Sequence, residues 1–489
     1  MKRAPFLKRL LGRYNYRMQP MSAGLPTSTP AFQMAMMYGV QPDIPGFHYH
    51  DKRRRKDIHF PRAGHAALVE DEQARGRPGI VTNGSAYGCV FTGGALNNLF
   101  TFTMLKRPTG AGLLRALSAF VVLAWVIVKS VVLTGAELIR ALLRFLADPA
   151  SAWARGWRSL AIKIGASVWV RELFTLAVSR DLYAGVPVIY VNYFDYDVSA
   201  HAYGPRPRRA FRALHRIDDS LEQLWRVLRR VPEYRYDLYL LSDHGQVAST
   251  PYQQLSGGKP FERLFFEQFF PSLAPRQAGP ARPQRHSLAS DIKAIRRHHE
   301  PGVFQRFMNY LEQDFPWVLG ELPEAREAHG VRVVSGGPYA FVYFLDFEHP
   351  LTLTQIDQRL PGLADEISRS RGIGYVLTRT DDGPVCLWRG KAYRLNDDEP
   401  GPFAGREDRA LVLQGIRDLM AMPCAGDLVL YGNDSADGNV SYIPETEAHG
   451  GPSSDEIQVF IVHPPDVRLP SPITHPTELY PHSLAYQEP

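Results

Sequence analysis

The sequence predicts an α/β fold with a mostly parallel sheet flanked by helices, and three observations point to it. A continuous β-branched and aromatic run, VPVIYVNYFDYD, is typical of a strand that is buried on both faces. A helical pattern follows over RRAFRALHRIDDSLEQLWRVLRR, and a second apolar run, YDLYLLSDHG, comes directly after it. Strand, helix and strand in this order form a βαβ unit with parallel strands. Sheets of this kind hold their functional side chains at the carboxyl ends of the strands.

The remainder of the chain divides around this unit. From Pro338 onward, strand and helix patterns alternate through YAFVYFLD, LTQIDQRLPGLADEISRS, GIGYVLTRT and PVCLWRGKAYRL, which predicts a smaller α+β lobe. The segments GDLVLYG and QVFIVHP then return the chain to the core. We therefore expect five parts: the first part of the core over 1–100, an apolar helical insert over 101–180, the second part of the core over 181–250, the α+β lobe over 251–424, and the last part of the core over 425–489.

The insert contains an apolar run from about Leu113 to Leu133, which is nearly long enough to cross a bilayer. Lys129 lies inside this run, where a charge is costly unless it pairs or reaches the surface. One interpretation is a helix in or on a membrane, and the other is a buried helix followed by an amphipathic one. The basic opening does not resemble a signal peptide, and three dispersed cysteines fit a reducing compartment. We expect a cytoplasmic protein, with membrane association through residues 113–133 as the alternative.

The composition is that of a globular protein and limits the partners. Of 489 residues, 45% are hydrophobic and 22% are charged, so the chain can bury a large core and is not a disordered tail. The net charge of +6 is a mild basic excess that suits anionic small molecules or membrane surfaces. No specific nucleic-acid binding is expected. The cysteines form no CxxC pair, so neither a disulfide framework nor a thiolate zinc site is indicated.

Three short clusters carry side chains that bind metals. Asp197 and His201 stand at i and i+4 just past the first predicted strand, and Asp243 and His244 are adjacent at the end of the second. His449 lies in a glycine-rich loop before a later strand. Carboxylate oxygen and imidazole nitrogen both suit zinc. Each cluster alone is weak evidence, because an Asp–His pair at this spacing is often a helix-start contact and a loop histidine is usually solvated.

The order of these clusters is similar to that of the alkaline phosphatase superfamily. Asp-x-x-x-His, Asp-His-Gly and His-Gly follow one another, and a PTxT segment precedes them. The branch that this sequence resembles is the type I phosphodiesterase and nucleotide pyrophosphatase family, in which the nucleophilic Thr lies in a run like PTKTFPN. The segment LPTSTPAFQ supplies Thr29, and Gly39, Pro42 and Gly46 follow at matching offsets, while Pro45 stands where the family has His. Thr27 and Ser28 are rival hydroxyls, and the offset to Gly39 favours Thr29.

The resemblance implies a metal-dependent hydrolase of phosphate esters with an alkaline-phosphatase-like fold, a Thr nucleophile and two divalent ions. The ions would be zinc, with manganese as the alternative. Asp197, His201 and His449 would bind one ion, and Asp243, His244 and Thr29 the other. The substrate would be a phosphate-ester small molecule or a lipid headgroup. Alternatives are a phosphatase, a sulfatase or a headgroup transferase that acts on a membrane lipid or glycan.

Two departures from the family pattern bear on this expectation. The family has an Asn that binds a phosphoryl oxygen, and the corresponding stretch here, GFHYHDK, offers His48, His50 or Lys52. The superfamily also has an Asp ligand at the end of its first core strand, whereas the first acidic residue here is Asp43. The opening RAPFLKRLLGRYNYRMQP looks like the helix that follows that strand. Either the start codon is placed too late or this ligand is missing, and a catalytically impaired, membrane-associated binding protein is therefore a further alternative.

Overall fold

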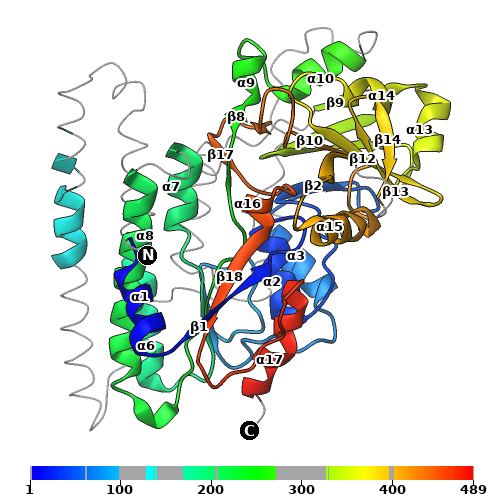
Figure 1. Ribbon diagram of the computed structural model, residues 1–489. Helices are drawn as coiled ribbons and strands as arrows, with labels where there is room; N and C mark the ends of the chain where they lie inside the picture. The colour runs from blue at the N-terminus through cyan, green and yellow to red at the C-terminus, as the bar shows by residue number, and fades with distance from the viewer. Residues whose placement is uncertain are drawn as a thin grey trace.

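The computed structural model describes most of the chain, and Figure 1 shows how its elements are arranged. The described residues are 3–60, 63–97, 128–136, 138–139, 142, 169–203, 208–270, 326–328, 330–395 and 401–487. They form two main sheets, of which one joins the two ends of the chain and the other is built from its later half.

The first sheet has the late strand β18 (Gln458–His463) at its centre. It lies between β1 (Arg17–Ser22) and β6 (Leu240–Leu241), and it pairs antiparallel with both. Since both neighbours run opposite to β18, β1 and β6 run parallel to each other. The carboxyl ends of β1 and β6 and the beginning of β18 therefore meet at one edge of the sheet, although they are far apart in the sequence.

Helices from distant parts of the chain pack beside this sheet. The predicted opening helix is confirmed as α1 (Pro5–Arg13), which packs against α8 (Arg208–Leu228). Asp218 of α8 accepts hydrogen bonds from the backbone N–H groups of Phe6 and Leu7, at 2.7 and 2.9 Å, and so caps α1 from another element. The helices α6 (Arg171–Ala184) and α7 (Asp195–Tyr203) pack with α8 on this side, whereas α2 (Thr29–Tyr38) and α3 (Ala63–Gln73) lie on the other side of the sheet (Figure 1) and belong to a separate hydrophobic core.

Short strands and helices complete this part of the molecule. Pairs of strands are formed by β2 (His48–Asp51) with β3 (Lys56–His59), β4 (Ser85–Tyr87) with β5 (Ile189–Val191), β7 (Val247–Ala248) with β17 (Glu447–Ala448), and β8 (Thr250–Pro251) with β16 (Val440–Ser441). Other short helices are η3 (Pro232–Tyr234), α16 (Ser454–Ile457), η6 (Pro476–Leu479), α17 (Tyr480–Leu484) and η7 (Ala485–Gln487). The helices α9 (Tyr252–Leu255) and α10 (Phe261–Phe269) contribute instead to a hydrophobic core of the second sheet.

The second sheet has seven strands in the order β14-β13-β12-β15-β11-β10-β9, and its ladders are antiparallel. Its strands are β9 (Arg326–Ala328), β10 (Val331–Gly336), β11 (Tyr339–Phe344), β12 (Tyr375–Thr380), β13 (Gly383–Trp388), β14 (Lys391–Arg394) and β15 (Leu428–Tyr431). The helices around it are α13 (Leu353–Arg359), α14 (Leu363–Ser368), η5 (Gly401–Phe403) and α15 (Arg409–Ala421). The strands and helices predicted from Pro338 onward are confirmed, and β15, expected to begin the last part of the core, pairs inside this sheet.

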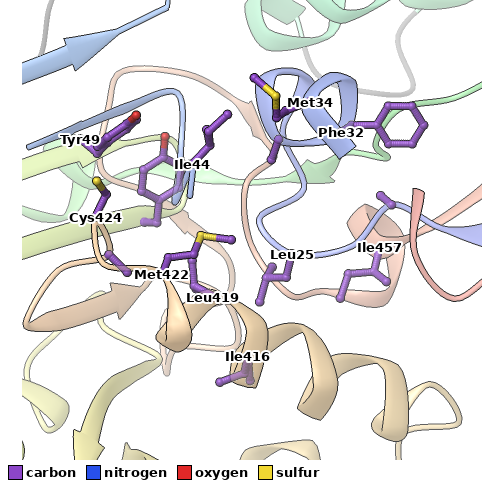
Figure 2. Packing of buried hydrophobic residues seen from close by; sticks show 14 of the residues in the cluster. Leu25, Phe32, Met34, Ile44, Tyr49, Ile416, Leu419, Met422, Cys424 and Ile457 are labelled. Carbon is purple, nitrogen blue, oxygen red and sulfur yellow. The ribbon is translucent and has the colours of Figure 1, made fainter. Parts of the chain in front are cut away.

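This sheet separates two hydrophobic cores. Along β11, Phe341 and Tyr343 belong to the core shared with α2, whereas Val342 and Phe344 belong to the core under α10, α13 and α14. Figure 2 shows part of the first of these cores, to which Phe32 and Met34 of α2 and Ile416 and Leu419 of the later helix α15 all belong. Burial of each large apolar side chain is worth roughly 1.5–3 kcal/mol, so this packing holds α2, which begins at Thr29, firmly in place.

The prediction of a mostly parallel sheet is wrong for the described strands. Only the pairs β4–β5 and β16–β8 are parallel among them, and the two strands of the predicted βαβ unit, β5 and β6, lie in different sheets, since β5 pairs with β4 and β6 with β18. The physical reason is that a continuous apolar run indicates that both faces of a strand are buried, but it does not indicate whether the neighbouring strands run parallel or antiparallel to it. An antiparallel strand such as β11, with a core on each face, has the same composition.

The predicted apolar helical insert lies mainly outside the described residues, as does 113–127 of the expected membrane segment. The described part is helical over 128–136, and Lys129 Nζ lies 2.9 Å from Glu172 Oε2, so this lysine pairs with an acidic partner. Within the part of the chain that the structure describes, no helix is both long and apolar enough to cross a membrane.

Candidate active site

The predicted site residues meet at the edge of the first sheet where β1 and β6 end and β18 begins. Thr29 is the first residue of α2, which the chain enters soon after β1. Asp243 and His244 directly follow β6, and His449 directly follows β17. Asp197 and His201 lie one helical turn apart on α7, on the same face. The structure thus brings together all six residues that the sequence singled out.

Two glycines allow the backbone to come close at this edge. A Cβ atom on Gly245 would lie 1.9 Å from the backbone oxygen of Asp455, and the Gly245 N–H donates to Glu456 O at 2.8 Å. Gly450 has a φ of +117°, which disfavours other residues, and a Cβ atom there would collide with Tyr339. The DHG and HGG sequences therefore let two loops pack against neighbouring segments and turn beside the site.

One group of contacts surrounds Thr29. Its Oγ1 donates a hydrogen bond to Asp243 Oδ2 at 2.8 Å and lies 3.3 Å from His244 Nε2. His244 Nε2 is 3.9 Å from the same Asp243 oxygen. Thr27, a rival hydroxyl in the sequence, instead accepts from Gly450 N–H at 2.8 Å and donates to Gly451 O at 2.9 Å, so it holds the loop after His449.

A second group surrounds Asp197. Its Oδ1 atom is 3.3 Å from His201 Nε2 and 3.7 Å from His449 Nε2, and it accepts from Gln246 Nε2 at 2.5 Å. The two groups touch, because the rings of His244 and His449 stack with their centroids 3.7 Å apart. Ligand atoms of Asp197, His244 and His449 lie within 4.8 Å of one another.

The three histidines share one orientation. His201 Nδ1 lies 2.9 Å from Glu447 O, His244 Nδ1 lies 3.0 Å from Gly245 O, and His449 Nδ1 lies 2.9 Å from Thr27 O. Because a carbonyl oxygen can only accept, each Nδ1 carries a proton in these bonds, and each Nε2 is directed into the site, where it can bind a cation when it is unprotonated. This is the arrangement in which imidazole binds a metal ion.

The charges at the site lower or raise the pKa values of its members. Burial alone would raise the pKa of Asp197, but the charges of His201, His449 and His244 outweigh burial and hold this pKa below its usual range. Burial would lower the pKa of His201, and the charges of Asp197 and Glu445 raise it well above its ordinary value. Burial, together with His244, lowers the pKa of His449 well below its ordinary value.

These residues fit divalent cations. Around a tetrahedral zinc ion with ligands at about 2.0–2.1 Å, neighbouring ligand atoms are roughly 3.3 Å apart. The distances between ligand atoms are close to that value: they are 2.8 to 3.9 Å in the Thr29 group, and 3.3 and 3.7 Å from Asp197 Oδ1 to the two histidine Nε2 atoms. In addition, both carboxylate oxygens of the fully buried Glu447 lack a hydrogen-bond partner among the described residues, and burial raises the pKa of Glu447 to about 8. A nearby cation would compensate such buried acidic groups.

Several side chains at the site were not predicted from the sequence. Gln246, Glu445 and Glu447 contact or adjoin the predicted ligands, and the only sequence signal for them was that they stand within a few residues of His244 or His449.

Two of the predicted candidates for a phosphate contact bind other side chains: Lys52 Nζ binds Asp427, and His50 Nδ1 lies 2.8 Å from Asp57 Oδ1. His48 contacts the ring of His59 edge-on.

Comparisons with known proteins show which family the chain belongs to. No curated protein matches the sequence significantly. Two similar solved structures are of phosphonoacetate hydrolase from Sinorhizobium meliloti 1021, in complex with phosphonoformate (12% identity) and with phosphonoacetate (13% identity). Both have a TM-score of 0.42 and cover 100% of this chain and 91% of the other. A family model, type I phosphodiesterase / nucleotide pyrophosphatase, matches residues 1–302, which include every predicted site residue except His449. The chain therefore belongs to the type I phosphodiesterase / nucleotide pyrophosphatase family of the alkaline phosphatase superfamily and is an enzyme of the phosphoric ester hydrolase kind.

Proposed function

We propose that this enzyme hydrolyses phosphate esters with Thr29 as the nucleophile and with two divalent cations. Asp197, His201 and His449 would hold one cation, and Asp243, His244 and Thr29 the other. The observation that carries the proposal is the contact of Thr29 Oγ1 with Asp243 Oδ2 at 2.8 Å, beside His244 Nε2 at 3.3 Å. A threonine hydroxyl between a carboxylate and an imidazole is poised for nucleophilic chemistry.

The donor set favours zinc, with manganese as the alternative. Imidazole nitrogen and carboxylate oxygen are ordinary zinc ligands, whereas a site made of oxygen atoms alone would favour magnesium or calcium. When bound, such cations lower the pKa of a coordinated hydroxyl and neutralise the charge that develops on the phosphoryl oxygens.

The protein contributes position, charge and proton handling. Thr29 stands at the N-terminus of the ten-residue helix α2, where the helix dipole favours the negative phosphate. Because Oγ1 donates its proton toward Asp243, its lone pairs are available to attack phosphorus. In the first step the Oγ1–P bond forms as the ester P–O bond breaks, the Oγ1 proton passes to Asp243 and the ester oxygen leaves as an alcohol or phenol. In the second step water attacks phosphorus and the Oγ1–P bond breaks, which releases phosphate from a monoester substrate or a phosphate monoester from a diester substrate.

The direct test is Thr29→Ala, assayed with p-nitrophenyl phosphate and bis(p-nitrophenyl) phosphate. We expect kcat to fall by roughly 10³-fold or more, because no other hydroxyl replaces the nucleophile. Metal content, measured by mass spectrometry of the purified protein, should remain largely unchanged. Thr354→Ala, at an exposed position on α13, is the matched control.

Two results would contradict the proposal. Undiminished turnover by Thr29→Ala would exclude Thr29 as the nucleophile. Full turnover by wild-type protein from which a chelator has removed the cations would exclude the metal-dependent mechanism. Activity on the monoester but not on the diester, or the reverse, would define which phosphate ester the enzyme accepts.

A lipid headgroup is a second candidate substrate, and one observation favours it. Apolar side chains on the described part of the segment 128–142 are half or more exposed: Val128, Val131, Val132, Leu138, Ile139 and Leu142. Exposed apolar side chains that cluster in this way are common at membrane contacts. Co-sedimentation with phosphatidylglycerol vesicles should then decrease for the Val131→Ser, Val132→Ser variant relative to the wild type. Equal recovery of both proteins in the supernatant would exclude this candidate.

A further inference from the structure

His201 differs from the other two histidines of the site in what faces its outer nitrogen. His244 Nδ1 and His449 Nδ1 each face a backbone carbonyl, at 3.0 and 2.9 Å. His201 Nδ1 faces the backbone oxygen of Glu447 at 2.9 Å and also the carboxylate atom Glu445 Oε2 at 2.9 Å. Of the three, His201 is thus the one whose imidazole has a full negative charge behind it.

Glu445 is held in this place by its own contacts. Ser441 Oγ donates to Glu445 Oε1 at 2.9 Å, so one carboxylate oxygen is bound to Ser441 and the other faces His201. Ser441 is fully buried in β16, which pairs with β8. The backbone N–H of Glu445 donates to Ile443 O at 2.9 Å. The carboxylate therefore has little freedom to turn away from the histidine.

We propose that Glu445 is a positioning residue for metal binding, which orients His201 and strengthens its bond to the cation shared with Asp197 and His449. This inference rests on the proposed function of the site. A carboxylate behind an imidazole fixes the proton on Nδ1, aims Nε2 at the metal and increases its basicity. His201 Nε2 already points at Asp197 Oδ1, 3.3 Å away, so both ligands converge on one place.

The test is Glu445→Gln, which keeps the size of the side chain and removes its charge. The dissociation constants of zinc are measured on the purified full chain by competition with a chromophoric chelator. We expect one of the two zinc ions to bind about 10- to 100-fold more weakly, as is typical when such a partner is lost. The other ion should bind as in the wild type, because His244 and Asp243 do not contact Glu445. Glu348→Gln, an exposed position on another loop, is the control and should match the wild type.

A second variant covers the case in which Glu445→Gln does not fold by circular dichroism. Ser441→Ala releases Glu445 Oε1 and leaves the contact with His201, so we expect a smaller loss, of a few-fold, for the same ion. Unchanged zinc affinity in a folded Glu445→Gln, or in Ser441→Ala if the first variant does not fold, overturns the inference while leaving the proposed function in place. A wild-type chain that binds no zinc or manganese would instead refute the proposed function.

Discussion

Two clusters of charged side chains in this molecule differ in burial and in how their charges are balanced: Lys52 and Asp427 are buried, whereas Asp197 at the candidate active site is 34% exposed. Lys52 Nζ donates to both oxygens of Asp427, at 3.0 and 2.9 Å, and to His349 O at 2.9 Å. Asp427 also accepts from Phe344 N–H and Leu351 N–H, at 2.6 and 2.7 Å. Each charge in this cluster is balanced within the protein, and the bonds tie β2 to the second sheet.

The cluster at the candidate active site is arranged differently. Asp197 and Asp243 face imidazoles, a hydroxyl and an amide, and the Nε2 atoms of the imidazoles are directed inward. The carboxylate of Glu447 is buried without a hydrogen-bond partner among the described residues. Buried acidic groups without a partner are costly, so this difference fits a structural role for the Lys52 cluster and supports the cation-binding role proposed for the Asp197 cluster.

The first and largest test of this comparison is Lys52→Met. Removal of one partner leaves Asp427 buried and unpaired, which is expected to lower the free energy of unfolding by about 3–5 kcal/mol. Denaturant titration measures this loss, and Lys56→Met, at an exposed position on the neighbouring strand, should change stability by less than about 0.5 kcal/mol. Zinc bound per folded chain should not change. If the two variants were equally stable, the Lys52 pair would not have the structural role assigned to it.

A smaller effect should appear in the pH dependence of metal affinity. The charges of Asp197 and Glu445 outweigh burial and raise the pKa of His201 well above its ordinary value, so without a cation this histidine carries a proton that the cation must displace. Burial and His244 lower the pKa of His449, which is therefore already neutral and releases none. Because the relevant proton belongs to a group with a raised pKa, affinity increases with pH, by about tenfold per unit below that pKa.

Calorimetric zinc titrations in two buffers of different ionisation enthalpy measure the number of protons released. We expect about one proton for the ion bound by Asp197, His201 and His449. An affinity for this ion that is the same at about pH 6 and about pH 8 would show that His201 is not protonated in the free site. The negative charge of Asp197 would then have to be balanced by a group other than a protonated His201.

The sequence alone determined the family, the kind of enzyme and the identity of the residues that meet at the site. Thr29, Asp197, His201, Asp243, His244 and His449 could be found because their order and their short spacings, such as i and i+4 on one helix, are local properties. The glycines beside two of them, His244 and His449, could also be interpreted from the sequence, because a residue without a Cβ atom permits a tight turn. The strands and helices after Pro338 could be predicted for the same reason, because they have distinct periodicities, whereas their extent as a separate lobe stays a prediction.

Only the tertiary structure decided how these elements pair and which side chains support the ligands. The composition of a strand reports that both faces are buried but not which strand lies beside it, so neither the central place of β18 between β1 and β6 nor the antiparallel ladders could be predicted. Likewise, Lys52 pairs with Asp427 and Glu445 with His201 across separations of more than two hundred residues. Such contacts depend on the meeting of distant segments, which local patterns do not encode.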